Sequence, residues 1–310
     1  MQTSSTILMV RPSNFGFNPE TAENNFYQKT DGRTPAEIRE LSRREFDAMV
    51  AALRDQGVEV LVVEDTEHPH KTDAVFPNNW FTTHPDGKLI LYPMYSPNRR
   101  LERRKEIIEQ LLHVGFTVNE IIDLSFFEES EQFLEGTGSM VIDHQAKVIY
   151  ACYSPRTHPI PLDYLAKIIG YSVVAFDAVQ EINGAVSPIY HTNVMMHIGT
   201  DIAVVCLDSI PKLAERQKVQ ESLTHSGKKV IPITPKQKFN FAGNMLEVSN
   251  KGGEKFTVMS QTALDSLHVG QIQQIEKYTT IISPSIPTIE KLGGGSARCM
   301  MAEVFLPTSN

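Results

Sequence analysis

Cys299 ends the segment Gly-Gly-Gly-Ser-Ala-Arg-Cys (residues 293–299), and no other residue of the chain is better placed to act as a nucleophile. Glycine has no Cβ, so the run predicts a backbone that turns freely and approaches a ligand, not one that packs. Residues 300–306 predict a strand. A thiol between a flexible loop and a rigid strand is exposed yet held, as covalent catalysis requires. The alternative is a small buried hydrophobic residue, as a lone cysteine often is.

Two further residues could assist a cysteine nucleophile. Glu135 opens Glu-Gly-Thr-Gly, just before a predicted strand, which would hold its carboxylate at the end of a sheet. His191, in Tyr-His-Thr-Asn, is the natural general acid and base near neutral pH. Each also has a plain structural reading: a β-turn with a solvated carboxylate, and a core or surface histidine.

Three other segments could bind a substrate. Arg156 follows a predicted strand in Ser-Pro-Arg-Thr, where its guanidinium could hold a carboxylate by two parallel hydrogen bonds; a surface ion pair is the alternative. Asn78 and Asn79 directly precede the single tryptophan, and could instead form a turn. The basic pair in Pro-Asn-Arg-Arg (residues 97–100) begins a predicted helix and could simply solvate it.

Composition limits the classes of function. The 310 residues carry a net charge of −8, which argues against nucleic acid as a partner. Three cysteines predict a reducing compartment without disulfides. No signal-peptide pattern or membrane-length apolar run is present, so we expect a cytoplasmic protein with no membrane partner. His68 and His70 lack a third ligand nearby, so we expect no metal, and no motif calls for another cofactor.

Helical and strand patterns alternate along the whole chain. Apolar periodicity predicts five helices, at 34–56, 98–114, 161–170, 209–226 and 260–278. Between them lie predicted strands at 58–63, 88–92, 140–142, 147–152, 172–176, 202–207, 229–233, 256–259 and 280–282. Five similar α/β units predict a closed ring. An open doubly wound sheet is the alternative, but the glycine-rich turn usual after its first strand is missing. No linker divides the chain, so we expect one domain over residues 1–310.

The order of these motifs resembles the guanidino-group-modifying (amidinotransferase, or pentein) superfamily, which includes arginine deiminase, dimethylarginine hydrolase and glycine amidinotransferase. The resemblance rests on Glu-Gly-Thr-Gly, His191 and Gly-Gly-Gly-Ser-Ala-Arg-Cys, with the segments of Arg156 and of residues 97–100 in support. From Arg-Pro-Ser-Asn-Phe (11–15) to Phe-Ala-Gly-Asn (241–244), the chain is most similar to the citrulline-utilisation hydrolase branch. The resemblance implies a five-bladed α/β propeller with pseudo-fivefold ββαβ repeats.

The resemblance also implies roles for single residues. Cys299 would be the nucleophile, activated by His191 as an imidazolium or by the bound substrate. His191 would then act as acid and base, and Glu135 would orient the substrate. The substrate, a small amino acid, would be bound by side chains from several segments: Asn79 or, less favourably, Asn78; Asn193; Asn14; Asn244; and Arg156 with Arg99 or Arg100 for its α-carboxylate. No cofactor is implied, and a homodimer is left open.

The chain departs from this family where it has asparagines at 78, 79 and 193, because relatives that bind guanidine often have aspartates there. A buried guanidinium needs carboxylates, whereas asparagine suits a neutral ureido group. We therefore expect citrulline to be hydrolysed to ornithine, ammonia and CO₂. The alternatives are an arginine deiminase or dihydrolase, an amidinotransferase, and a non-catalytic binding protein of the same fold.

Overall fold

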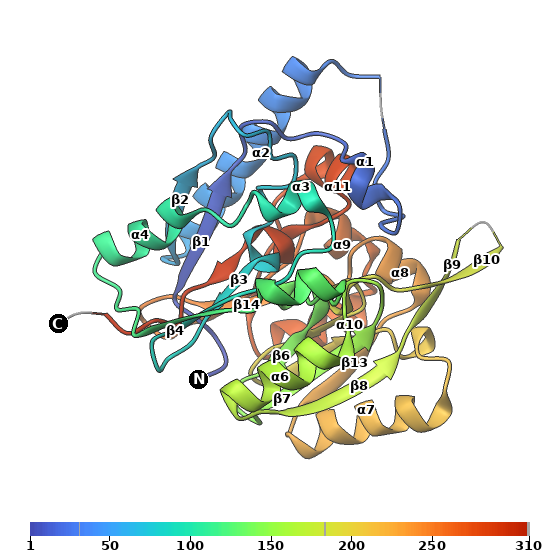
Figure 1. Cartoon of the computed structure of the whole chain (residues 1–310). Helices are drawn as coiled ribbons and strands as arrows, with labels where there is room; N and C mark the ends of the chain where they lie inside the picture. Colours follow the sequence, from blue (N-terminus) through green and yellow to red (C-terminus); the bar gives the residue numbers. More distant parts are fainter. Residues whose placement is uncertain (31, 183, 309–310) are drawn as a thin grey trace.

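The computed structural model describes residues 1–30, 32–182 and 184–308, which form a mixed α/β fold (Figure 1). Most of its strands form five separate three-stranded sheets, ordered β17-β1-β2, β3-β4-β5, β6-β7-β8, β11-β12-β13 and β14-β15-β16. In every sheet the middle strand pairs antiparallel with the first strand and parallel with the third. The described strands therefore repeat one unit five times, and none of the sheets closes on itself.

The strands are short and differ in position within the unit. The middle strands are β1 (Thr6–Arg11), β4 (Lys88–Leu91), β7 (Val148–Tyr153), β12 (Ile202–Val205) and β15 (Lys255–Val258). The third strands are β2 (Glu59–Glu64), β5 (Glu120–Asp123), β8 (Ser172–Asp177), β13 (Lys229–Pro232) and β16 (Thr280–Ile282). The first strands are β3 (Phe81–Thr83), β6 (Val141–Asp143), β11 (Met196–Ile198), β14 (Leu246–Ser249) and β17 (Ala302–Glu303). The core lies around the middle strands; all four residues of β12 are fully buried.

Parallel neighbours need a crossover, and helices supply it in each unit. The crossover helices are α2 (Pro35–Asp55), α4 (Lys105–His113), α6 (Pro159–Ile169), α7 (Leu213–His225), and α9 (Gln261–Ser266) with α10 (Val269–Glu276). Helix α2 begins with a capping box between Thr34 and Glu37 and buries Phe46, Met49 and Leu53. In Figure 1, α2, α4 and α7 lie at the periphery, while β3, β6 and β14 lie nearer the middle.

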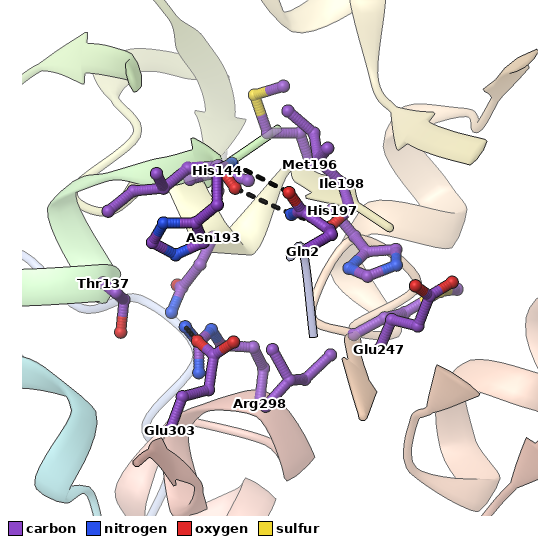
Figure 2. Close-up of a pocket in the computed structure, with 14 residues that line it drawn as sticks. Gln2, Thr137, His144, Asn193, Met196, His197, Ile198, Glu247, Arg298 and Glu303 are labelled. Atoms are coloured by element: carbon purple, nitrogen blue, oxygen red, sulfur yellow. Dashed lines mark hydrogen bonds and ion pairs between the residues drawn. The ribbon is translucent and has the colours of Figure 1, made fainter. Parts of the chain in front are cut away.

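The first strands contact one another near the middle of the molecule. Strand β11 contacts both β6 and β14, and β17 contacts β3. Gln2 joins two of these strands: its amide nitrogen donates to the carbonyls of Ile142 (2.9 Å) and Ile198 (3.3 Å), and its oxygen accepts from the amide of His144 (Figure 2). The N-terminal segment therefore helps to fix the sheets relative to each other.

The predicted elements are largely confirmed. All nine predicted strands and the helices at 34–56, 161–170 and 209–226 are present within a few residues. The helix predicted at 98–114 is two helices, α3 (Pro97–Arg100) and α4, because the chain turns between them so that Glu102 can face inward and bind Arg99. The helix predicted at 260–278 is also split, because His268 begins a new capping box at α10.

Several elements were not predicted. They include β1, β5, the first strands β3, β11 and β14, and the short helices α1 (Pro19–Ala22), α8 (Pro235–Phe239) and α11 (Pro287–Gly293). The hairpin of β9 (Val179–Ile182) and β10 (Ala185–Pro188), which projects from the body in Figure 1, was not predicted either. The strand predicted at 300–306 is reduced to the two residues of β17, since the chain first makes a 3₁₀ turn, Ala297–Met300. Cys299 lies in this turn, so it is held by helical backbone rather than at the start of a long strand.

Candidate active site

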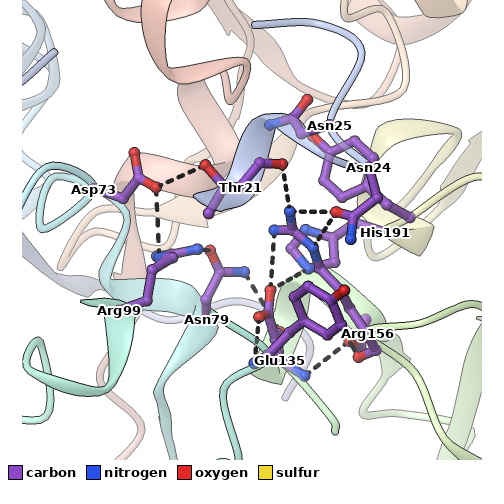
Figure 3. Close-up of polar contacts among 12 residues, drawn as sticks. Thr21, Asn24, Asn25, Asp73, Asn79, Arg99, Glu135, Arg156 and His191 are labelled. Carbon is purple, nitrogen blue, oxygen red and sulfur yellow. Dashed lines mark hydrogen bonds and ion pairs between the residues drawn. The ribbon is translucent and has the colours of Figure 1, made fainter. Parts of the chain in front are cut away.

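Five turns, each just before the first strand of a sheet, bring the candidate residues together. They carry Asn79 before β3, Glu135 before β6, His191 and Asn193 before β11, Asn244 before β14, and Cys299 before β17. Turns from different units touch: the single-turn helix α5 (Gly136–Ser139) contacts the 3₁₀ turns Pro77–Asn79 and Thr192–Val194. Equivalent positions of the repeated unit therefore supply the site; Figure 3 shows three of these residues, Asn79, Glu135 and His191.

Cys299 is buried, with 6% of its surface exposed. Two side-chain amides reach its sulfur: Nδ2 of Asn244 lies 3.3 Å from Sγ, and Nδ2 of Asn193 lies 3.6 Å away. The Oδ1 atom of Asn244 accepts from the backbone N–H of Arg298, which fixes the turn that carries the thiol. Both amides can donate to a thiolate, and neither brings a charge.

Glu135 is fully buried at the centre of the polar contacts in Figure 3. Its Oε2 atom lies 2.8 Å from Nε2 of His191 and 3.4 Å from Nη1 of Arg156, and its Oε1 atom accepts from the backbone N–H of Tyr95. Burial raises the pKa of this carboxyl, but Arg156 and then His191 more than offset burial and hold the pKa well below its ordinary range. Glu135 is therefore a carboxylate that already has its cationic partner.

His191 does not carry the charge expected from the sequence. Burial lowers the pKa of its imidazole to about 4, although the hydrogen bond to Glu135 acts in the opposite direction. Burial therefore favours the neutral ring in this closed site, and an imidazolium during the reaction stays a prediction. Because Nε2 faces the carboxylate of Glu135, that nitrogen carries the proton and Nδ1 is left as the basic atom.

Arg156 lies over the centre of the site and is almost fully buried. Its guanidinium donates to the side chain of Asn24, to the carbonyl of Thr21 (2.9 Å) and to Glu135, and stacks 5.0 Å from the ring of Tyr190. Its donors are thus occupied by the protein itself. A substrate carboxylate can reach Arg156 only by replacing Asn24 and Thr21.

The structure decides between Arg99 and Arg100. Arg99 is buried and donates to Glu102, to Oδ1 of Asn79 (2.9 Å) and to the carbonyl of Phe76. Arg100 lies outside the cavity, where it pairs with Glu128 at 3.3 Å. Of the two predicted arginines, Arg99 alone reaches the site, and it does so mainly by positioning Asn79.

The asparagines also divide into two groups. Nδ2 of Asn79 lies 3.4 Å from the carbonyl of Glu135, so Asn79 borders the cavity. Asn78 turns away and donates to the hydroxyl of Thr137, joining two of the five turns. Asn14 is not at the site: its amide donates to the carbonyl of Glu67 at 2.7 Å, near the surface.

Asp73 was missed by the sequence reasoning. It borders the same cavity, is 2% exposed, and accepts from Asn18 (2.7 Å) and Thr21 (3.3 Å) through Oδ2. Its Oδ1 atom has no hydrogen-bond partner within the described ranges, and burial raises its pKa despite Arg99 at 3.8 Å. The one signal available in the sequence was its position a few residues before the two asparagines. Side chains of one short segment can reach the same cavity.

A covering segment, residues 18–28, closes the cavity. It contains helix α1 (Pro19–Ala22) and binds the body through Asn18, Thr21 and Asn24 as above, and through the amide of Gln28, which donates to the carbonyl of Gly293. The closed cavity has a volume of about 20 Å³. That volume holds a water molecule but not an amino acid, so the segment must move before a substrate enters.

The glycine motifs serve close packing, which corrects one sequence expectation. A Cβ at Gly138 would lie 2.3 Å from Nδ2 of Asn79 and 2.7 Å from Cε1 of His191, so only glycine lets these side chains approach. A Cβ at Gly293 would lie 2.7 Å from the ring of Phe76, and one at Gly295 would lie 2.9 Å from it. Gly293 and Gly295 therefore pack against an aromatic ring, while Gly294 takes a positive φ of 63° beside Asn25.

No group of three or more histidine, cysteine, aspartate and glutamate side chains in residues 1–30, 32–182 and 184–308 is arranged to hold a metal ion. Within the same ranges, each helix is too short or too polar to span a bilayer. His68 and His70 are both exposed, on a loop outside the candidate site.

The chain is similar to several known proteins. The sequence profile of the family described as N,N dimethylarginine dimethylhydrolase, eukaryotic, matches residues 11–306. No curated protein sequence matches the chain significantly. Among solved structures, the substrate-bound N-terminal domain of ArgZ, an arginine dihydrolase from the ornithine-ammonia cycle in cyanobacteria, is similar with a TM-score of 0.71 at 15% identity, covering 97% of this chain and 99% of that one.

Two other solved structures have the same fold. AgrE in complex with L-arginine gives a TM-score of 0.73 at 16% identity, with 98% of this chain and 41% of that chain covered. A dimethylarginine dimethylaminohydrolase adduct with 4-chloro-2-hydroxymethylpyridine gives 0.63 at 16% identity, with 97% and 99% covered. The chain thus spans about two fifths of AgrE and of full-length ArgZ.

Proposed function

The chain belongs to the N,N dimethylarginine dimethylhydrolase family of the guanidino-group-modifying superfamily, and from this premise we propose that it is a cysteine hydrolase whose substrate is citrulline. The reaction would convert citrulline and water to ornithine, ammonia and CO₂. The observation that carries the choice of substrate is the environment of Cys299, where two neutral amides, from Asn193 and Asn244, reach the sulfur. The carboxylate of Glu135 is already paired with Arg156.

A neutral ureido group fits such an environment. Its carbonyl oxygen needs donors, which the side-chain amides supply, and its N–H groups need acceptors, which Glu135 and Oδ1 of Asn193 supply. A guanidinium would instead compete with Arg156 for the carboxylate of Glu135. Burying an incompletely paired cation costs several kcal/mol, roughly, in a site without water.

The proposed mechanism begins with proton transfer from Cys299 to neutral His191. The thiolate attacks the ureido carbon and forms a C–S bond. The imidazolium, stabilised by Glu135, then gives its proton to the departing nitrogen, and the C–N bond breaks. His191 next takes a proton from a water molecule that attacks the thioester-like carbon, and the C–S bond breaks. Carbamate released in this way decomposes to ammonia and CO₂.

Arg156 would bind the α-carboxylate of the substrate. In the closed site its guanidinium holds Asn24 and the carbonyl of Thr21. When the covering segment moves away, these donors become free in a two-pronged geometry that suits a carboxylate. Arg99 would act through Asn79, which it positions by a 2.9 Å hydrogen bond.

A second candidate is hydrolysis of arginine, as a dihydrolase or deiminase. Asp73 favours it, because a buried carboxylate oxygen without a partner among the described residues could accept from a guanidinium. The printed names of ArgZ, an arginine dihydrolase, and of the AgrE complex with L-arginine also support it.

We further propose that residues 1–310 act as one catalytic domain whose five units are the blades of a propeller. The identical strand order of the five sheets and the contacts between their first strands support this arrangement. A ring would also explain why equivalent turns from all five units meet at a single site.

A product assay tests these proposals. Purified protein is incubated with citrulline, arginine or dimethylarginine, and ornithine, citrulline and ammonia are measured; ornithine from citrulline at the highest kcat/KM is the expected result. An Asn193→Asp variant should move the preference toward arginine by roughly tenfold or more, since it restores a charge partner. A wild-type preference for arginine would replace citrulline by the second candidate. Failure to form ornithine, citrulline or ammonia from any of the three substrates would favour an amidinotransferase or a binding protein.

A further inference from the structure

A second cavity lies beside the candidate active site, and Asn193 connects the two. Its Nδ2 atom contacts the sulfur of Cys299, yet its side chain also lines this second cavity (Figure 2). The two sets of lining residues share no member, so Asn193 links the cavities only through its contact with Cys299, which lines the first. The second cavity has a volume of about 30 Å³. One water needs roughly 10–15 Å³ by this measure, so the occupant must be about as small as water.

Glu247 gives this cavity a buried negative charge. The side chain is 2% exposed, and its Oε1 atom accepts from the backbone N–H (2.8 Å) and the hydroxyl (2.5 Å) of Thr200. Its Oε2 atom has no hydrogen-bond partner in the part of the chain that the structure describes. Within those same residues, no lysine, arginine or histidine nitrogen lies within 4.0 Å of the carboxylate. Arg298, which also lines the cavity, is already paired with Glu303 at 3.0 Å.

His197 adds a second acceptor beside that carboxylate. Burial, aided by Arg298, lowers its pKa to about 3, so the ring is neutral; its hydrogen bond to the backbone of Met245 opposes this shift. That bond uses one nitrogen as the donor, and Nε2 has no partner among the described residues. A Cβ at Gly199 would lie 2.6 Å from Oε2 of Glu247 and 3.4 Å from Nε2 of His197. The two acceptors without hydrogen-bond partners therefore lie close to the same point in the cavity.

The third bare acceptor is Oδ1 of Asn193, which likewise finds no partner within the described ranges. Three acceptors without donors, one of them a carboxylate without a counter-charge, are a costly arrangement in a buried space. A small cation with several N–H donors would satisfy the two acceptors that border Gly199, Oε2 of Glu247 and Nε2 of His197. Ammonium is close to water in size and offers four tetrahedral donors.

We propose that this second cavity binds a small monovalent cation, and that its natural occupant is ammonium, which forms when the carbamate released from Cys299 decomposes. The source of the ion rests on the proposed function, whereas binding of the ion does not. Potassium from the surrounding solution has the same charge and a similar size, so the experiment must separate the two sources.

The first experiment measures thermal unfolding of the catalytically silent Cys299→Ser protein without substrate. Ammonium chloride is compared with potassium chloride and with tetramethylammonium chloride, whose cation is too large for the cavity, at equal ionic strength. Binding to the folded state raises the melting temperature as the ion concentration rises. We expect a rise of a few degrees with ammonium relative to tetramethylammonium, and loss of that rise when Glu247→Gln is added.

Asp143→Asn is the matched control, because Asp143 is also fully buried but pairs with Lys228 and does not line the cavity. It should lower stability yet keep the difference between the salts. An equal rise with potassium would show that solution cations occupy the site and would overturn ammonium as its natural occupant. Equal melting temperatures in all three salts would overturn the site itself.

A second measurement keeps the proposal testable if Glu247→Gln does not fold. Crystals of the Cys299→Ser protein are soaked in thallium(I), which has the charge of ammonium and a similar radius. An anomalous peak between Glu247 and His197 is expected, and its absence at full soak would contradict the proposal. Neither experiment depends on turnover, so a failed hydrolase assay and a failed cation site are distinguishable.

Discussion

The two cavities that meet at Asn193 are similar in size but differ in how their charges are balanced. In the first, the carboxylate of Glu135 has two partners, Arg156 and His191, and Arg99 has Glu102. In the second, the carboxylate of Glu247 has an oxygen with no partner in the described chain, and the neighbouring histidine is neutral. The first cavity also has one carboxylate oxygen without a partner among the described residues, Oδ1 of Asp73, but Arg99 lies 3.8 Å from that carboxylate, whereas Glu247 has no such cation beside it.

This difference indicates different modes of binding. A substrate that enters the first cavity must exchange with contacts the protein already makes, above all those of the covering segment to Arg156 and Asp73. Selectivity in the first cavity therefore depends on the free-energy difference between the hydrogen bonds that the protein makes to itself and those that it makes to the substrate. The second cavity demands no exchange, so charge and size alone select its occupant.

The largest effect is expected from the nucleophile. Cys299→Ser should lower kcat by roughly 10³-fold or more, because a hydroxyl without a dedicated base is a far weaker nucleophile. The far-ultraviolet circular dichroism spectrum and melting temperature should stay close to those of wild type. Mass spectrometry of acid-quenched wild-type enzyme should detect an adduct on the peptide that contains Cys299. Wild-type turnover by the variant would contradict the covalent mechanism.

Glu135→Gln should break the balance of the first cavity. It leaves the buried guanidinium of Arg156 without its carboxylate and His191 without its orienting partner. Removing one member of a buried ion pair costs about 3 kcal/mol of folding free energy, and kcat should fall by roughly 10²-fold.

Urea unfolding and steady-state kinetics measure the two effects of Glu135→Gln. Glu290→Gln is the control, since Glu290 is also buried but is bound by hydroxyls of Thr262 and Ser296. Equal losses of kcat in both variants would mean that Glu135 acts only through stability.

Arg156 and Arg100 offer a smaller and cleaner comparison. Arg156→Lys keeps the charge but loses the planar fork, so KM for the amino-acid substrate should rise by roughly tenfold, the effect of one charge-assisted hydrogen bond. Arg100→Lys should leave KM unchanged, because Arg100 lies outside the cavity and binds Glu128. A rise of KM in the second variant, or none in the first, would refute the assignment of the α-carboxylate site.

The sequence predicted what depends on local pattern. Helix α2 was predicted almost to the residue because its capping box and apolar stripe are contained in one segment. Cys299, His191 and Glu135 were identified because each belongs to a short motif whose glycines or turns leave a visible signature. The first strands of the sheets, of which β17 has two residues, are too short for any periodicity to appear.

What the sequence could not predict depends on contacts between distant segments. Asp73 belongs to the site because Asn18 and Thr21, more than 50 positions away, close over it. The neutral state of His191 follows from complete burial, which no local pattern reveals. The same holds for Gly293 and Gly295, which leave room for the ring of Phe76.

The last prediction concerns pH and both cavities together. Burial lowers the pKa of His191 to about 4 and that of His197 to about 3, below the unfolded value of about 6.5. Between these values the unfolded chain binds more protons than the folded protein, so stability is complete above pH 6.5 and is lost as the pH falls toward 4. Each histidine can contribute at most about 1.4 kcal/mol per pH unit. Urea unfolding at pH 7.5, 6 and 5 should therefore show a falling free energy of unfolding. His197→Gln should flatten the slope without changing kcat at pH 7.5, whereas an unchanged slope would mean that His197 is protonated in the folded state and that the second cavity lacks its neutral acceptor.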